Sequence, residues 1–353
     1  MVKENREELE FRRVEVAARI VEPGEPGGRE TSKPVEIRYD PVSGRSCRIT
    51  FARAATEGEK TLPPPPPTAA ERASCPFCRP QVERLTPTLS PQLSDQPRLK
   101  RGESLLFPNL FPYGRYSAVS VVDDNHFVEI GTADAAAYAD CLLNCVDYLH
   151  RVMAADPEAV YLAITQNHLP AAGGSLVHPH LQVHADRIPA NLPRFLETRA
   201  NAYHAAAGSY LFSDYLAHEK QEQSRLIGAS GEWHWLAAFA PEGFFELWAI
   251  RPGSCSLLEL SDGEFSALAD GITRVQKFYR SLGHNAYNLG MVACEKPDSR
   301  LELRLRMVVR SDYAEWTRND ITGFETMLGE MATFSAPEET AARARKFWPA
   351  SGS

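Results

Sequence analysis

The sequence predicts an α+β protein built from two similar halves. Short β-branched and apolar runs have the length and composition of strands, and longer segments with apolar residues three or four positions apart separate them as helices. In the first half, a strand at 117–122 is followed by a helix over 135–153 and strands at 160–165 and 176–184. In the second half, strands at 233–239 and 244–250 are followed by a helix over 262–282 and strands at 287–292 and 301–309. The repeated order suggests an internal duplication.

The composition excludes several classes of protein. A chain of 353 residues has room for two domains, and 43% hydrophobic with 24% charged residues is typical of a globular protein. The net charge of -8 argues against a general nucleic-acid binder. No apolar run reaches the roughly 20 residues of a membrane helix, and the charged N-terminus lacks a signal-peptide core. Seven cysteines without an export signal predict reduced thiols, metal ligands and a cytoplasmic location.

The N-terminal region is predicted to contain little regular structure before residue 35. Residues 1–34 have the mixed charge of a polar lead-in. Strands at 35–41 and 47–51 then flank turn residues and predict a hairpin. Five consecutive prolines, Pro63 to Pro67, predict a stiff polyproline connector, a more economical interpretation than a ligand for a proline-recognition domain.

One segment predicts the chemistry. His178, His180, Gln182 and His184 have two-residue spacing, so on a strand their side chains would share one face. The small residues at 171–175 precede them and would let the backbone approach a phosphate. A neutral imidazole beside such an anion site can attack phosphorus. The segment therefore predicts phosphoryl or nucleotidyl transfer.

Each residue of this segment has a candidate role. His180 is the predicted nucleophile, and Gln182 can donate a hydrogen bond to a phosphoryl oxygen without adding charge. His184 continues the row without an assigned task. Any one of these residues alone fits ordinary strand or turn chemistry, and only their combination favours a site. Further candidates for the α-phosphate are Asn167, Gly173, Gly174 and Ser175.

Cys75 and Cys78 form a C-x-x-C pair for which two interpretations are open. A redox pair is disfavoured because Arg79-Pro80 follows immediately and a helix cannot start there. A zinc knuckle needs two further ligands, and His126 and His178 are the best candidates for a Cys₂His₂ site. For His126 an ordinary exposed loop histidine is an equally good interpretation.

Several motifs in the first half resemble the galactose-1-phosphate uridylyltransferases, a branch of the histidine-triad superfamily. The resemblance covers roughly residues 35–190, and the second half matches in pattern only. The segments that carry it are Arg38-Tyr39-Asp40-Pro41, Cys75-Pro76-Phe77-Cys78, Phe107-Pro108-Asn109-Leu110-Phe111-Pro112 and Asn167-His168 through His178-Pro179-His180-x-Gln182.

The resemblance implies two tandem histidine-triad-like domains, each an antiparallel sheet with packed helices. Their implied bounds are 35–200, with the knuckle and the active strand, and 201–347, on the acceptor side. It implies that His180 becomes nucleotidylated in a ping-pong reaction. Cys75, Cys78, His126 and His178 would bind structural Zn²⁺, with no organic cofactor. Phe107, Asn109 and Phe111 would hold the nucleoside, Arg53 is a weaker candidate for the nucleotide, and the α-phosphate would contact Asn167, Ser175 and Gln182.

The chain departs from the family pattern on the acceptor side. Where relatives often carry histidines for a second metal, residues 301–307 place Glu302, Arg304 and Arg306 on one face. The two arginines could receive a phosphate-bearing acceptor, and a solvated or salt-bridged strand face is an equally good interpretation. In the segment that resembles the hexose site, Asn319 replaces a lysine, Phe324 replaces a tyrosine and Glu325 is retained.

The leading hypothesis is a nucleotidyltransferase that passes a nucleoside monophosphate from a nucleotide-sugar to a phosphorylated small molecule. Uridylyl transfer from a UDP-sugar in galactose metabolism is its most specific form, with a homodimer suggested by the resemblance. Leu110, at a position that is often acidic, leaves the choice between uridine and adenosine open. The alternatives are a phosphorylase of nucleotide-sugars or dinucleoside polyphosphates that uses inorganic phosphate, and a non-catalytic zinc-stabilised nucleotide-binding protein.

Overall fold

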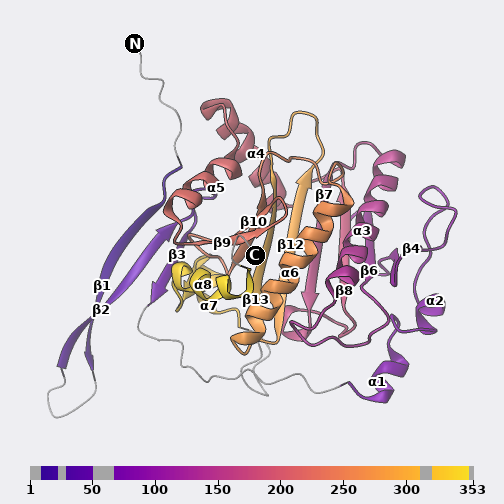
Figure 1. The fold of residues 1–353 in the computed structure, drawn as a ribbon, viewed down its shortest axis with the longest axis horizontal. Coiled ribbons are helices and arrows are strands. Elements are labelled where there is room, and N and C mark those ends of the chain that lie inside the picture. Colours follow the sequence, from indigo (N-terminus) through magenta and orange to yellow (C-terminus); the bar gives the residue numbers. More distant parts are fainter. Residues whose placement is uncertain (1–8, 23–28, 51–66, 311–319, 350–353) are drawn as a thin grey trace.

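The computed structural model describes residues 9–22, 29–50, 67–310 and 320–349. Its centre is a ten-stranded antiparallel sheet with the order β4-β5-β6-β8-β7-β12-β13-β11-β10-β9 (Figure 1). The strands are β4 (Leu99–Arg101), β5 (Ser104–Pro108), β6 (Tyr116–Val121), β7 (Tyr161–His168), β8 (His180–Asp186), β9 (Leu226–Ser230), β10 (Trp233–Ala237), β11 (Leu247–Arg251), β12 (Ala286–Cys294) and β13 (Leu303–Arg310).

The predicted duplication is visible in the topology of this sheet. The first half contributes strands in the order 4-5-6-8-7 and the second half in the order 9-10-11-13-12, so the two orders are equivalent. The halves meet along β7 and β12, which pair antiparallel from Tyr161↔Cys294 to His168↔Tyr287. The predicted α+β class with antiparallel sheets is confirmed. The exact domain bounds stay a prediction because one sheet runs through both halves.

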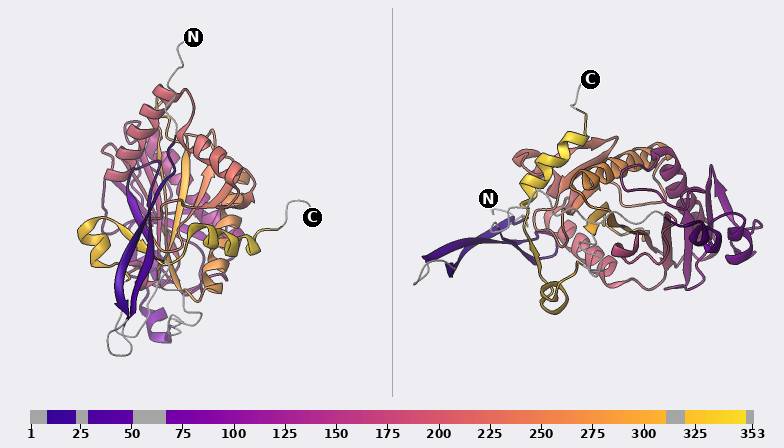
Figure 2. Two further views of the ribbon diagram at one scale, coloured as in Figure 1. Left: turned by 90° about the vertical axis from the view of Figure 1, so that its left-hand side faces the viewer. Right: turned by 90° about the horizontal axis from the view of Figure 1, so that it is seen from below.

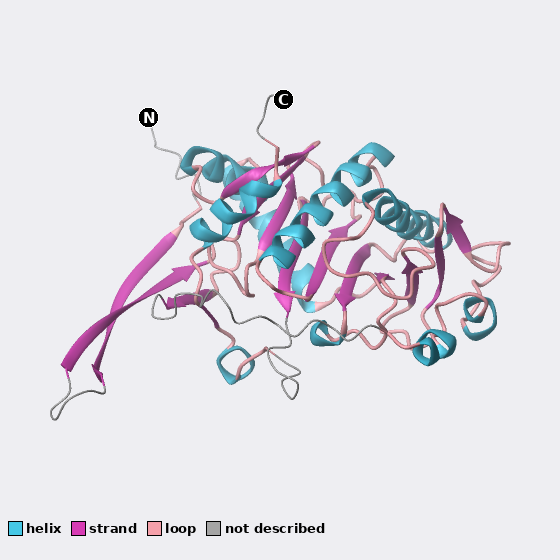
Figure 3. Ribbon diagram, turned by 60° about the horizontal axis from the view of Figure 1, so that its bottom comes forward, coloured by secondary structure: helices cyan, strands magenta, loops and turns pink. Residues whose placement is uncertain are grey.

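Helices cover the two faces of the sheet unequally (Figure 3). The two predicted helices, α3 (Ala135–Ala155) and α6 (Asp262–Ser281), pack on one face and enclose the largest apolar core. On the other face, α4 (Asn191–Ala207) and α5 (Leu211–Glu222), which the sequence analysis did not predict, cover the second half. The remaining helices are short: α1 (Ala69–Ser74), α2 (Gln81–Leu85), α7 (Gly323–Leu328) and α8 (Pro337–Ala344).

A second sheet has the order β1-β2-β3-β14. Its strands are β1 (Arg12–Glu22), β2 (Arg29–Tyr39), β3 (Ser46–Thr50) and β14 (Met331–Thr333). The predicted hairpin before residue 51 is confirmed, because β2 pairs antiparallel with β3. The predicted lead-in at 1–34 was wrong for β1, which pairs with β2 along its whole length from Arg12↔Tyr39 to Glu22↔Arg29. Arg53 and residues 63–66 of the proline run lie outside the described residues.

The chain offers no helix with the length and apolar composition of a membrane span in the part that the structure describes. All seven cysteines are free, as their number and context predicted.

A buried ion cluster fixes the second sheet to the body. Arg38 of β2 and Arg225 before β9 are almost fully buried. Both guanidiniums contact the Glu338 carboxylate on α8, at N–O distances of 2.9 Å. Burial by itself would raise the pKa of Glu338, but hydrogen bonds and charges from the two arginines lower it to about 2. The carboxylate therefore stabilises the fold above its ordinary pKa, and that contribution is lost as the pH falls toward about 2.

We expect Glu338→Gln to lower the free energy of unfolding by about 2 kcal/mol at neutral pH, because it leaves two buried guanidiniums without their shared anion. Glu339→Gln, at the exposed neighbouring position on the same helix, should stay within about 0.5 kcal/mol of the parent. Urea unfolding measures both values. Equal effects of the two substitutions would show that the cluster does not anchor this sheet.

Candidate functional site

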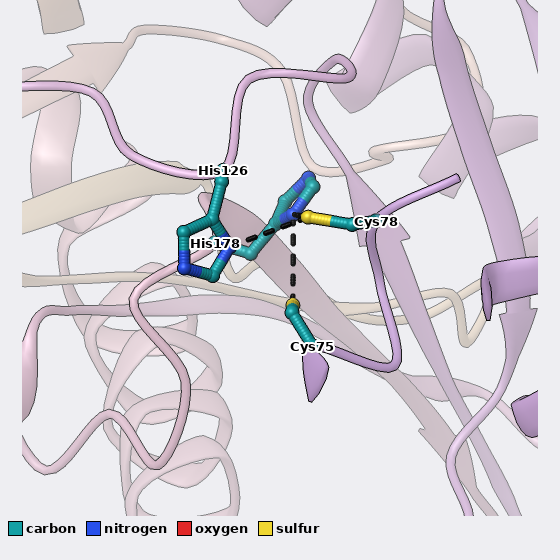
Figure 4. A group of neighbouring side chains, drawn as sticks. All are labelled: Cys75, Cys78, His126 and His178. Atoms are coloured by element: carbon teal, nitrogen blue, oxygen red, sulfur yellow. Dashed lines mark hydrogen bonds between the residues drawn. The ribbon is translucent and has the colours of Figure 1, made fainter. Parts of the chain in front are cut away.

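Four side chains gather in one Cys/His cluster (Figure 4). Cys75 and Cys78 come from the segment between α1 and α2, His126 from the loop after β6, and His178 from just before β8. Their ligand atoms all lie within 4.8 Å of one another. The Cys78 Sγ lies 3.3 Å from His126 Nδ1 and 3.5 Å from His178 Nδ1. Sulfur and nitrogen ligands of a tetrahedral Zn²⁺ are about 3.6 Å apart, so the cluster fits such an ion.

A second contact sets the tautomer of His178. Its Nε2 lies 2.9 Å from the Asp123 carbonyl oxygen, which can only accept, so Nε2 carries the hydrogen. The lone pair of Nδ1 then faces the two sulfurs. Burial lowers the pKa of His178 and favours the neutral ring that a metal requires.

His180 is held as a neutral imidazole with one free nitrogen. Its Nδ1 donates to the backbone carbonyl oxygen of His178 at 2.7 Å, so the lone pair is on Nε2. Burial lowers its pKa, although the hydrogen bond to His178 opposes this shift. The Phe77 ring packs edge-on at 5.2 Å between ring centroids. Nε2 of His180 is therefore a candidate nucleophile near neutral pH.

The predicted row of four side chains on one strand is corrected at its first member. β8 begins at His180, and His178 lies before it, turned toward the Cys/His cluster. Pro179 between them has no backbone N–H to extend the strand pairing. His180, Gln182 and His184 do occupy alternate positions of β8, so their side chains share one face of the sheet. The His184 ring lies beside that of Tyr113, with 6.3 Å between the ring centroids.

The loop before β8 depends on two consecutive glycines. Gly173 follows a 3-10 turn at Pro170–Ala172 and has a φ of 85°, in the left-handed region. A Cβ on Gly174 would lie 2.8 Å from the Asn167 carbonyl oxygen. The Ser175 side chain after them is exposed and lines a cavity of about 380 Å³ beside Cys75 and His126. The predicted phosphate loop therefore lies against the Cys/His cluster.

Asn167 has a partner that the sequence analysis missed. Its Oδ1 accepts a hydrogen bond from Asn288 Nδ2 on β12 at 2.7 Å, and the same nitrogen donates to the Ala172 carbonyl at 2.8 Å. Asn288 thus joins the second half of the chain to the loop at 170–175. The sequence feature that could have indicated this role is the single side-chain amide, that of Asn288, in the otherwise apolar strand predicted at 287–292.

The predicted nucleoside residues differ in exposure. Phe107 is buried against Phe77 and shares a cross-strand row with Val119 and Gln182. Asn109 Oδ1 accepts from the backbone N–H of Phe111 at 3.0 Å. The Phe111 side chain is 76% exposed, so of the two phenylalanines it is the one free to stack on a base.

Two of the predicted acceptor residues, Arg304 and Arg306, lie on β13 in the second half of the sheet, and Glu325 lies on α7. Arg304 and Arg306 line a cavity of about 420 Å³. Arg306 and Glu325 line an adjoining one of about 210 Å³. Arg306 donates to the Glu246 carboxylate at 3.0 Å, as the salt-bridged interpretation anticipated. The Arg304 guanidinium stacks on Trp248 at 4.1 Å and makes no ion pair or hydrogen bond within the described residues.

A single row of residues links the two ends of the site. Gln182 pairs with Thr165, Thr165 with Gly290, and Gly290 with Arg306. Three strand spacings separate Gln182 from Arg306, about 14 Å. Gly290 has no side chain, so the row is open between Thr165 and Arg306.

Comparison with solved structures identifies the class of fold. An ADP-glucose phosphorylase from Arabidopsis thaliana, with bound ADP-glucose, matches with a TM-score of 0.68 and 20% identity. The match covers 88% of this chain and 99% of that one. A uridylyltransferase mutant matches with a TM-score of 0.64 and 19% identity, over 88% of this chain and 97% of the other. The chain therefore shares its fold with a uridylyltransferase and with an ADP-glucose phosphorylase, as its motifs predicted.

Sequence comparison adds one relative. An uncharacterised protein of Archaeoglobus fulgidus is 29% identical over 347 residues, which cover 96% of this chain and 99% of the relative. No protein-family model matches the chain.

We expect the purified protein to contain about one tetrahedral metal ion per chain, and Cys78→Ser to remove most of it, because the Cys78 Sγ contacts both histidines of the cluster. Cys255→Ser, at a half-buried cysteine outside the cluster, should leave the metal content unchanged. Elemental analysis of the three proteins measures this content. Equal content in Cys78→Ser and the parent would contradict the assignment.

Proposed function

We propose that this protein is a nucleotidyltransferase with a covalent His180 intermediate. The observation that carries the proposal is the free Nε2 of a buried, neutral His180 whose Nδ1 is fixed by the His178 carbonyl. The likeness to a uridylyltransferase and to an ADP-glucose phosphorylase supports the reaction class through the fold.

In the first step, Nε2 attacks the α-phosphorus of a nucleotide-sugar. The N–P bond forms, the P–O bond to the sugar phosphate breaks, and the sugar phosphate leaves with the electron pair. The imidazole becomes positively charged while Nδ1–H continues to donate to the His178 carbonyl, which stabilises that charge. Gln182 and the 173–175 loop would hold the phosphoryl oxygens. No proton has to move.

In the second step, an acceptor phosphate oxygen attacks the same phosphorus and the N–P bond breaks. The histidine returns to its neutral form. Arg304 would bind the anionic part of the acceptor, because burial lowers the pKa of its guanidinium despite the opposing charge of Asp40, and a bound anion would offset that cost. Glu325 would contact the acceptor from the adjoining cavity.

Zn²⁺ in the Cys/His cluster would be structural. Cys75, Cys78, His126 and His178 would hold it, and it would supply rigidity rather than a reacting group, because all four protein ligands close its coordination. The four ligands would then hold the His178 ring in place, and with it the backbone carbonyl that accepts from His180 Nδ1.

A phosphorylase is the second candidate. In that reaction inorganic phosphate takes the nucleotide from His180. Phe324, in place of the tyrosine of the family pattern, favours it because the hydroxyl expected to meet a sugar phosphate is missing. The first step is common to both candidates.

We expect UDP-glucose or ADP-glucose, labelled at the α-phosphate, to leave acid-labile label on the protein without an acceptor. His180→Gly should abolish labelling. His184→Gln, which changes a histidine four residues further along β8 on the same face, should retain it. Because burial lowers the His180 pKa, the labelling rate should fall less between about pH 7.5 and about pH 6 than the roughly fourfold loss expected of a histidine with the ordinary pKa of about 6.5. Release of the label by galactose 1-phosphate supports the transferase, and release by inorganic phosphate alone supports the phosphorylase.

Absence of label on the parent protein, or equal labelling of His180→Gly, would overturn both enzymatic candidates. Calorimetric binding of the nucleotide-sugar without any label would then support the non-catalytic alternative.

A further inference from the structure

The β1–β2 ribbon is an unusual appendage. It extends away from the body of the molecule (Figure 2). Each strand has 11 residues, about twice the common length of a strand. Among the described residues, β3 pairs only with Val35–Tyr39 of β2, so the outer part of the ribbon has two strands in the part of the chain that the structure describes. A two-stranded ribbon in water is marginally stable, and a further strand would stabilise it.

The outer edge of β1 is open to such a strand. β1 is the edge of its sheet and pairs with β2 alone among the described residues. The register is constant along the strand, without a bulge, and β1 contains no proline. Bulges and prolines are devices that proteins use to protect exposed edges. Val14, Val16 and Ile20 are between 36% and 41% exposed on one face of this edge.

The sequence of β1 is complementary to itself in the antiparallel direction. If two copies pair about Ala17, Val14 lies opposite Ile20 and Val16 opposite Ala18. Glu15 then lies opposite Arg19 of the second copy, and the symmetry makes this contact twice. The apolar residues Val14, Val16 and Ile20 of the two copies then lie on the same face of the joined sheet. This follows because a two-fold axis perpendicular to a sheet does not exchange its two faces.

The charges of the single chain support this arrangement. Glu15 lies opposite Glu36 of β2, whose carboxylate already contacts the Arg38 guanidinium, so the cross-strand neighbour of Glu15 is an anion rather than a cation. Arg19 pairs with Ser32. Neither Glu15 nor Arg19 forms an ion pair within the described residues. In the paired arrangement, Arg19 of each copy would lie across the new strand pairing from Glu15 of the other copy.

We propose that two copies of this chain dimerise by antiparallel pairing of their β1 strands about Ala17, which joins the ribbons into one four-stranded sheet. This interface does not involve the site at His180, and the proposal is independent of the proposed function.

Charge reversal with rescue tests the pairing. Glu15→Arg should weaken dimerisation by about tenfold or more, because two attractive contacts become repulsive. The double variant Glu15→Arg/Arg19→Glu restores both contacts in the opposite sense and should recover the dimer. Glu232→Arg, an exposed charge in the turn between β9 and β10, is the matched control and should behave as the parent. Sedimentation velocity over a dilution series measures the equilibrium.

A cysteine on the axis tests the register. Paired Cα atoms of antiparallel strands are about 4.5 or 5.5 Å apart, within the range of a disulfide. Ala17→Cys should therefore form a cross-linked dimer on mild oxidation, whereas Val21→Cys, far from its own copy in this register, should not. A monomeric parent at every concentration, or a dimer that Glu15→Arg leaves unchanged, would overturn the proposal. So would equal cross-linking of the two cysteine variants.

Discussion

The hydrogen bond from His180 Nδ1 to the His178 carbonyl is the interaction on which the site depends. It connects two features of His178: the side chain belongs to the Cys/His cluster, and the backbone carbonyl accepts a hydrogen bond from His180, the proposed nucleophile. The hydrogen bond of His178 Nε2 to Asp123 fixes that ring in turn. In our proposal, metal binding and the geometry of His180 are therefore coupled through His178, and loosening the cluster would misplace Nε2 without touching His180.

The continuous sheet connects the two halves of the proposed site. The proposed nucleophile, His180, lies on β8 and Arg304 on β13, strands in equivalent positions of the two repeats. The open row from Gln182 through Gly290 to Arg306 connects them across β7 and β12. Asn288 reinforces the junction by holding Asn167 and the loop at 170–175. In our proposal, the duplication supplies the acceptor side of the site.

The sequence was sufficient for features with local signals. The periodicity of α3 and α6 predicted both helices, and the C-x-x-C pair with two histidines predicted a cluster that the structure brings together. Features that depend on distant contacts were missed. Asn288 is recognisable only through its partner Asn167, and β1 through its pairing with β2. The sequence analysis placed His178 on the strand, whereas β8 begins at His180. The error arose because contacts within the Cys/His cluster, and not the two-residue period of a strand, determine where the His178 side chain points.

The tautomer of His180 can be measured directly by ¹⁵N NMR on histidine-labelled, metal-loaded protein without substrate. We expect a neutral ring with hydrogen on Nδ1 and a lone pair on Nε2 near neutral pH, because the His178 carbonyl accepts from Nδ1 and burial lowers the His180 pKa. Comparison with His180→Gly assigns the signal. A hydrogen on Nε2, or a charged ring at neutral pH, would contradict this expectation.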